Sequence, residues 1–184
     1  SYTINFLNHI YEGLVRFDRD LQIVPALAES WEIISPTTWR FNLRKDVTFH
    51  NGNAFTAEDV LASLTRVSDE SSPLKGNLPA YKSATVVDDH TIDIELIGAY
   101  PLLLNDLTNI HIFDKDWLVE NNAEMPTDVS AGVEGYATFN TNGTGPFVLE
   151  SRTPEAQTVL TVNEGWWDEP AHNLTRIEFQ PVTS

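Results

Sequence analysis

The stretch that decides the fold is WRFNLRKDVTFHNGNAFTAEDVLASLTRV, residues 39–67. From Trp39 to Leu43 large apolar side chains alternate with polar ones, which predicts a half-buried strand. Val47–Phe49 continues the alternation, and Asn51-Gly52 predicts a turn because both residues tolerate a positive φ. The first half of the stretch therefore predicts extended chain folded back through a tight turn.

The second half of the stretch predicts a helix. Thr56 is a favourable N-cap, and Glu58 and Asp59 fall in the first turn, where carboxylates favour the helix dipole. Asp59 also stands in the capping-box position, three residues after the cap. An apolar stripe at helical spacing follows, made of Val60, Leu61, Leu64 and Val67.

The remaining segments mix helical and extended patterns. Before the stretch we expect a helix at 4–15 and a short, proline-led helical turn at 25–31. After it we expect strands at 84–87, 91–96, 147–149, 158–162 and 176–179, short helices at 101–107 and 114–121, and long connections at 68–80 and 121–145. Strands and helices are interspersed without regular alternation, which indicates a mixed α/β (α+β) fold.

Composition excludes several function classes. The 184 residues are 41% hydrophobic and 21% charged, close to globular averages. The 27 Asp and Glu outnumber the 11 Lys and Arg, giving a net charge of −16, which disfavours nucleic acid as a partner. Without cysteine there are no disulfides and no thiolate metal sites.

Several short motifs, in this order and spacing, resemble one protein family. They are YEGL at 11–14, PALAESW at 25–31, the strand and turn at 39–52, TAEDV at 56–60, GTGPF at 143–147 and NEGWW at 163–167 with Pro170. The chain resembles the family 5 extracellular solute-binding proteins, which include dipeptide-, oligopeptide-, glutathione- and nickel-chelate-binding receptors. It departs from them at Trp166, where the family more often has Tyr, and at 35–38, where the family usually has Asp-Gly.

The resemblance implies part of a type II periplasmic-binding-protein clamshell. Residues 1–34 would begin the main lobe, 35–142 would form a small N-terminal subdomain, and 143–184 would return as strands of the main lobe. Family members are longer, so most of the partner lobe is expected to lie outside this chain. The chain is then expected to be an N-terminal fragment.

The resemblance also implies a function. The protein would be the substrate-binding component of an ABC importer, capturing a peptide or similar small solute and delivering it to an inner-membrane permease. It would be periplasmic, or extracytoplasmic with a lipid anchor attached before Ser1, and it would be neither an enzyme nor dependent on a cofactor. Whether the ligand is a peptide, glutathione, a nickel chelate or a sugar stays open.

By the same resemblance, three places face the cleft between the lobes. The first holds Tyr2 and Ile4, of which Tyr2 is suited to stack on a ligand. The second holds Lys75, which is suited to pair with a carboxylate. The third holds Asn109 and His111, which are suited to hydrogen bonding. For each of these residues, ordinary surface or packing duty is the competing interpretation.

Two other function classes stay open. The aromatic content, with Trp166-Trp167 as a stacking pair, is compatible with a carbohydrate- or protein-interaction module. A glycoside hydrolase is the weaker alternative, because among 27 acidic residues some carboxylate pair arises by chance. The five histidines lack the i, i+4 spacing of a helical metal site, so we expect no metal ligands. The sequence holds no Gly-x-Ser-x-Gly, His-Glu-x-x-His or phosphate-binding glycine loop, so we expect no catalytic residues.

Overall fold

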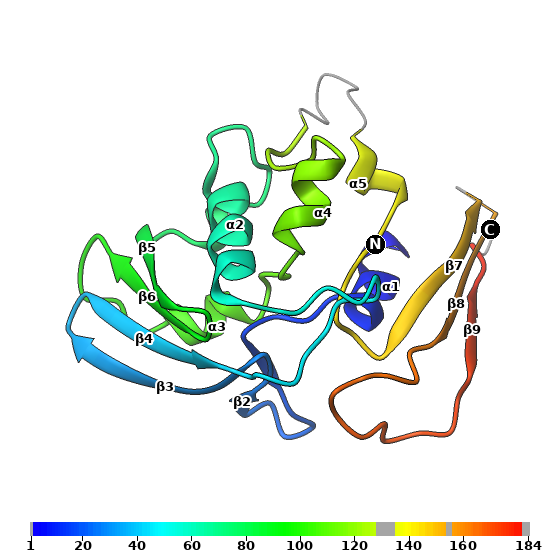
Figure 1. Ribbon diagram of the computed structural model, residues 1–184, viewed down its shortest axis with the longest axis horizontal. Helices are drawn as coiled ribbons and strands as arrows, with labels where there is room; N and C mark the ends of the chain where they lie inside the picture. The colour runs from blue at the N-terminus through cyan, green and yellow to red at the C-terminus, as the bar shows by residue number, and fades with distance from the viewer. Residues whose placement is uncertain (1, 128–134, 154–155, 182–184) are drawn as a thin grey trace.

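The computed structural model describes residues 2–127, 135–153 and 156–181, with side chains from Phe6 onward (Figure 1). In these ranges the helices are α1 (Tyr2–Ile10), α2 (Ala57–Ser68), α3 (Leu103–Leu107), α4 (Lys115–Glu120) and α5 (Tyr136–Phe139), with a 3-10 turn at Lys75–Asn77. The strands are β1 (Val15–Phe17), β2 (Ile23–Pro25), β3 (Ala28–Ser35), β4 (Thr38–Leu43), β5 (Tyr81–Asp88), β6 (Thr91–Leu96), β7 (Phe147–Thr153), β8 (Gln157–Val162) and β9 (Arg176–Phe179). The predicted mixed α/β fold is confirmed.

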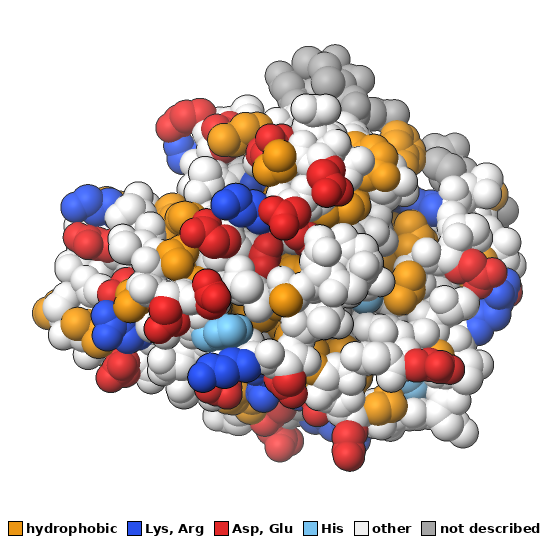
Figure 2. Space-filling model, in the orientation of Figure 1, with side chains coloured by type: hydrophobic (Ala, Val, Ile, Leu, Met, Phe, Trp, Pro, Cys, Tyr) orange, Lys and Arg blue, Asp and Glu red, His pale blue; other side chains and the backbone are white. Residues whose placement is uncertain are grey.

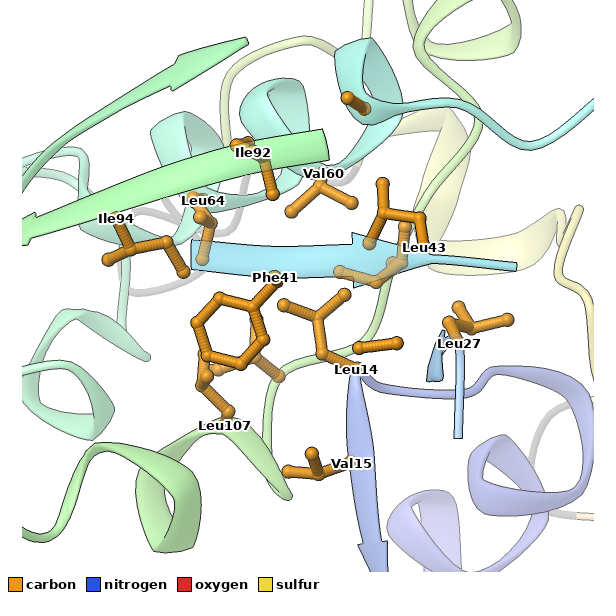
Figure 3. Close-up of a cluster of buried hydrophobic side chains, with 14 of the residues drawn as sticks. Leu14, Val15, Leu27, Phe41, Leu43, Val60, Leu64, Ile92, Ile94 and Leu107 are labelled. Atoms are coloured by element: carbon orange, nitrogen blue, oxygen red, sulfur yellow. The ribbon is translucent and has the colours of Figure 1, made fainter. Parts of the chain in front are cut away.

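The first core lies on an antiparallel sheet with the strand order β3-β4-β6-β5. Alternate residues of β4 and β6 are buried, and the register places Phe41 opposite Ile92 and Trp39 opposite Ile94. Helix α2 packs on this sheet and buries Val60 and Leu64 with them (Figure 3). The alternation and the apolar stripe in residues 39–67 therefore predict this layer correctly.

The predicted turn at Asn51-Gly52 is also present. Gly52 has a φ of +93°, a value that L side chains rarely adopt. The backbone N–H of Phe49 donates to the Asn53 carbonyl over 2.8 Å, and Thr48 pairs with Ala54 in an isolated bridge. This tight hairpin brings residues 50–53 beside the segment that precedes β7, through a 2.8 Å hydrogen bond from His50 N to the Gly143 carbonyl.

Two of the expected helical segments need correction. The helix expected at 4–15 ends at Ile10, and residues 15–17 form β1, paired with β2. The helical turn expected at 25–31 is wrong, because β3 begins at Ala28 and pairs with β4, with Trp31 opposite Phe41. Pairing with a neighbouring strand overrides the local helical pattern in both places.

A second core joins α1 to the three-stranded antiparallel sheet β7-β8-β9. Its buried members are Phe6, Ile10, Tyr11, Phe147 and Leu160. The two larger sheets stand at opposite ends of the view in Figure 1, with α1 and α4 between them. The expected strands at 147–149, 158–162 and 176–179 are confirmed, and the first of them continues to Thr153.

The division into 1–34, 35–142 and 143–184 stays a prediction. The sheet of the first core already begins with β3 at Ala28, ahead of residue 35. Leu14, Val15 and Leu27 also belong to that first core, as Figure 3 shows. The first core therefore draws on both of the first two predicted parts.

The surface reflects the excess of acidic residues. Figure 2 shows Asp and Glu side chains spread over the visible face among fewer Lys and Arg. None of the helices in the described part of the chain has the length and apolar character needed to span a bilayer.

Candidate functional site

A hollow of about 440 Å³ lies where the two cores meet. The end of α1, strand β1 and the segment after α3 form its walls, and Pro146 and Trp166 close it from the side of the second sheet. Its lining residues are Asn8, Tyr11, Glu12, Gly13, Val15, Arg16, Phe17, Ala26, Thr108, Asn109, His111, Pro146 and Trp166. We take this hollow as the candidate ligand site because it combines concavity, aromatic surface and convergent polar groups.

His111 is held in a defined orientation. Its Nε2 lies 3.1 Å from Oδ1 of Asn8, so Nε2 carries the proton and donates, and Nδ1 is left as an acceptor. Its ring stacks on Tyr11 with centroids 5.6 Å apart and an interplanar angle of 18°. Burial lowers the pKa of His111 to about 4, so the imidazole is neutral at pH 7.

Asn109 and Thr108 follow directly after α3. The Thr108 hydroxyl donates to the Asn105 carbonyl over 2.6 Å, and the Asn109 backbone N–H donates to the Asp106 carbonyl over 3.1 Å. These bonds fix the backbone while the Asn109 side chain stays exposed at the hollow. An exposed amide on a fixed backbone is well placed to contact a ligand.

Glu12 connects the walls of the hollow through hydrogen bonds to its carboxylate. A single carboxylate oxygen, Oε1, accepts three hydrogen bonds: from Thr144 Oγ1 at 2.9 Å, Trp166 Nε1 at 3.2 Å and Trp167 Nε1 at 2.8 Å. Burial raises the pKa of Glu12, while the three donors and the charge of Arg16 act in the opposite direction. Glu12 thereby ties the end of α1 to the two segments that flank β7 and β8.

Arg16 brings a cation to the hollow. It extends from β1, its side chain is 49% exposed, and its Nη2 lies 3.3 Å from Oδ2 of Asp168. Its charge also acts on Glu12. Arg16 therefore forms an ion pair with Asp168 and acts on Glu12 through its charge alone.

Glycines let the walls approach each other closely. The Gly145 N–H donates to the Ile10 carbonyl over 2.8 Å. A Cβ at Gly143 or Gly145 would stand only 2.1 or 2.6 Å from that same carbonyl oxygen. The GTGPF motif therefore has a steric reason, since only glycine lets this loop lie against the end of α1.

The structure brings together two of the five predicted site residues. Asn109 and His111 both line the hollow. Lys75 is not among the lining residues; it is exposed in the 3-10 turn and forms an ion pair with Glu70. Tyr2 and Ile4 lie in α1, and their side chains fall outside those that the structure describes. The roles predicted for all five stay predictions.

Sequence reasoning missed Glu12, Arg16 and Asn8 as site residues. The YEGL motif gives one indication of Glu12, because a carboxylate next to the buried Tyr11 needs hydrogen-bond partners. The sequence predicts packing or stacking for Trp166-Trp167, whereas in the structure the two indole N–H groups also donate to Glu12.

The comparisons with known proteins agree with this architecture. The family model described as "Bacterial extracellular solute-binding proteins, family 5 Middle" matches residues 22–184. The chain belongs to the bacterial extracellular solute-binding proteins of family 5. The resemblance seen in the motifs is thus confirmed.

Relatives within family 5 show the range of the similarity. The periplasmic murein peptide-binding protein MppA of Escherichia coli is 25% identical over 97% of this chain and 35% of its own length. The structure of NikZ from Campylobacter jejuni in complex with Ni(L-His) matches with a TM-score of 0.84 and 25% identity, over 96% of this chain and 34% of that one. The periplasmic binding protein DppA of Helicobacter pylori, in complex with the peptide STSA, matches with a TM-score of 0.76 and 29% identity, over 95% and 37%.

The similarity also confirms the clamshell fold class. The chain spans about a third of the length of these relatives. It therefore corresponds to one part of a family 5 protein.

Proposed function

We propose that the chain is the N-terminal part of the substrate-binding component of an ABC importer. The protein captures a peptide or similar small solute in the periplasm and delivers it to an inner-membrane permease. The observation that carries this proposal is the family 5 match over residues 22–184, together with the likeness to binding proteins that hold a nickel chelate and a peptide.

The proposed mechanism is capture without chemical conversion. The hollow beside Asn109 and His111 is one wall of the ligand site, and a second lobe outside this chain closes over it by a hinge motion. The closed form is what the permease recognises. In this proposal the protein is a receptor and not an enzyme, so the ligand leaves unchanged.

A thermal-shift panel on the full-length protein tests the proposal. The panel contains di- and oligopeptides, glutathione, nickel chelates and oligosaccharides. We expect one class to raise the melting temperature by several degrees, since a ligand that binds only the native state stabilises it. Mass spectrometry of the recovered ligand should find it intact; a converted ligand, or no shift with any class, contradicts the proposal.

A further inference from the structure

The charged groups at the hollow are one Arg and two carboxylates, which partly offset one another. Among the described residues that line it, the only Lys or Arg is Arg16, which pairs with Asp168 at 3.3 Å and also acts on Glu12. Together these three groups carry a net charge of −1 when both carboxylates are ionised. A ligand carboxylate entering here therefore meets a guanidinium that already pairs with Asp168, which reduces what the carboxylate gains from that charge.

The groups that remain available are neutral, and several of them accept hydrogen bonds. His111 uses Nε2 to donate to Asn8, which leaves Nδ1 as an acceptor. The Asn109 side chain has no hydrogen-bond partner within the described residues and is exposed at the hollow. Its amide oxygen is a second acceptor, beside the N–H donors of the same group. With its pKa lowered to about 4, His111 supplies no positive charge at pH 7.

The charge of the whole chain also favours an N–H donor over a carboxylate. The chain carries a net charge of −16, which favours the approach of cationic groups over anionic ones. The partly exposed rings of Phe17 and Trp166 add apolar surface beside the acceptors. The site is thus suited to a polar N–H group carried on an apolar body.

We propose that the hollow receives an N–H donor group of the ligand, an amide or an ammonium, in preference to a carboxylate. This inference rests on the proposed function and specifies which chemical group of the solute faces this lobe. It assigns His111 and Asn109 as the acceptors and Arg16 as a cation already paired with Asp168.

Isothermal titration of the full-length protein with three probes tests the inference. The probes are trialanine amide, N-acetyl-trialanine amide and N-acetyl-trialanine, which carry one positive charge, no charge and one negative charge. We expect the two amides to bind, and the anionic probe to bind at least about 10-fold more weakly.

Charge substitutions at Asn109 test whether the preference among the three probes arises at this hollow. N109K should weaken binding of both amides by about 10-fold or more, while N109D should leave it unchanged or tighten it for the cationic probe. The matched controls are N173K and N173D, which make the same charge changes at an exposed residue outside the hollow, and which should leave all three affinities within about 2-fold.

The outcomes separate the inference from the proposed function. If the wild-type protein binds the probes without regard to charge, or if N109K tightens binding, the inference is overturned and the receptor function stands. If the wild-type protein binds none of the three, the proposed function fails for peptides and the inference fails with it.

Discussion

At the scale of single residues, the loop that leads into β7 packs so closely against α1 that two of its positions have no room for a side chain. Gly143 and Gly145 lie against the carbonyl of Ile10, the last residue of α1. The same loop accepts the Nε2 hydrogen bond of His50 at the Gly145 carbonyl over 2.9 Å. Because glycine has no side chain, this loop can pack against both the end of α1 and His50, which are distant from it in the sequence.

Gly143→Ala should destabilise the protein by about 3 kcal/mol. The new Cβ would stand 2.1 Å from the Ile10 oxygen, and because that atom belongs to the backbone, α1 or the loop must move. Urea denaturation measures the change. The control is Gly76→Ala, where nothing lies within 4 Å and the stability should change by less than about 1 kcal/mol. Equal stability of the two variants would contradict this explanation of the motif.

At the scale of elements, Asp59 joins two helices. Its Oδ2 accepts from the Thr56 N–H at the start of α2, and its Oδ1 accepts from the Lys115 N–H at the start of α4, both at 2.8 Å. Burial raises the pKa of Asp59 to about 6 despite these two donors, with Asp114 and Asp116 adding to the increase. One carboxylate thus caps the first turn of both helices.

This raised pKa predicts an unusual pH dependence. Because the folded protein holds the proton more tightly than the unfolded chain does, the contribution of Asp59 is fully present below its ordinary pKa of 3.8 and is lost as the pH rises through about 6. Over that window the free energy of unfolding should fall by up to about 3 kcal/mol relative to D59N. Urea denaturation at pH 4, 5, 6 and 7 measures the difference. Curves that stay parallel for wild type and D59N would refute it, and D46N, which changes an exposed residue, is the control.

The elements also show how far sequence patterns reach. Strand β4 and helix α2 were predictable because alternation and the apolar stripe are local properties of residues 39–67. Strands β1 and β3 were not, since a three-residue strand carries almost no pattern, and β3 buries only one of its eight residues. Their extended form comes from pairing with β2 and β4, which local propensity does not encode.

The candidate site was predictable only in part for a similar reason. Asn109 and His111 were found through the family resemblance, which places that segment at the cleft. Glu12 was missed because its partners stand far along the chain, Thr144 by 132 residues and Trp167 by 155. No periodicity relates such positions, so only the folded arrangement reveals that they converge on one oxygen atom.

At the scale of the whole molecule, two cores meet at Glu12. Its backbone carbonyl accepts from the Ile112 N–H over 2.9 Å, on the side of the first core, while its carboxylate takes the three donors that flank the second sheet. Glu12 therefore lies both at the candidate site and at the junction between the two cores. The positions of the hollow's walls depend on how firmly this junction is held.

Glu12→Ala should loosen that junction. It leaves Thr144, Trp166 and Trp167 without their common acceptor, at a cost of roughly 3 kcal/mol for the three donors together. Because the loss falls between the cores, urea curves followed by tryptophan emission and by far-UV circular dichroism should cease to coincide. Glu12→Gln keeps an amide oxygen as acceptor, so its curves should still coincide and its loss should be smaller. Glu29→Ala, at an exposed residue of β3, is the control. If E12A unfolds as cooperatively as E29A, the two cores are held together by their packing, and Glu12 serves the ligand site alone.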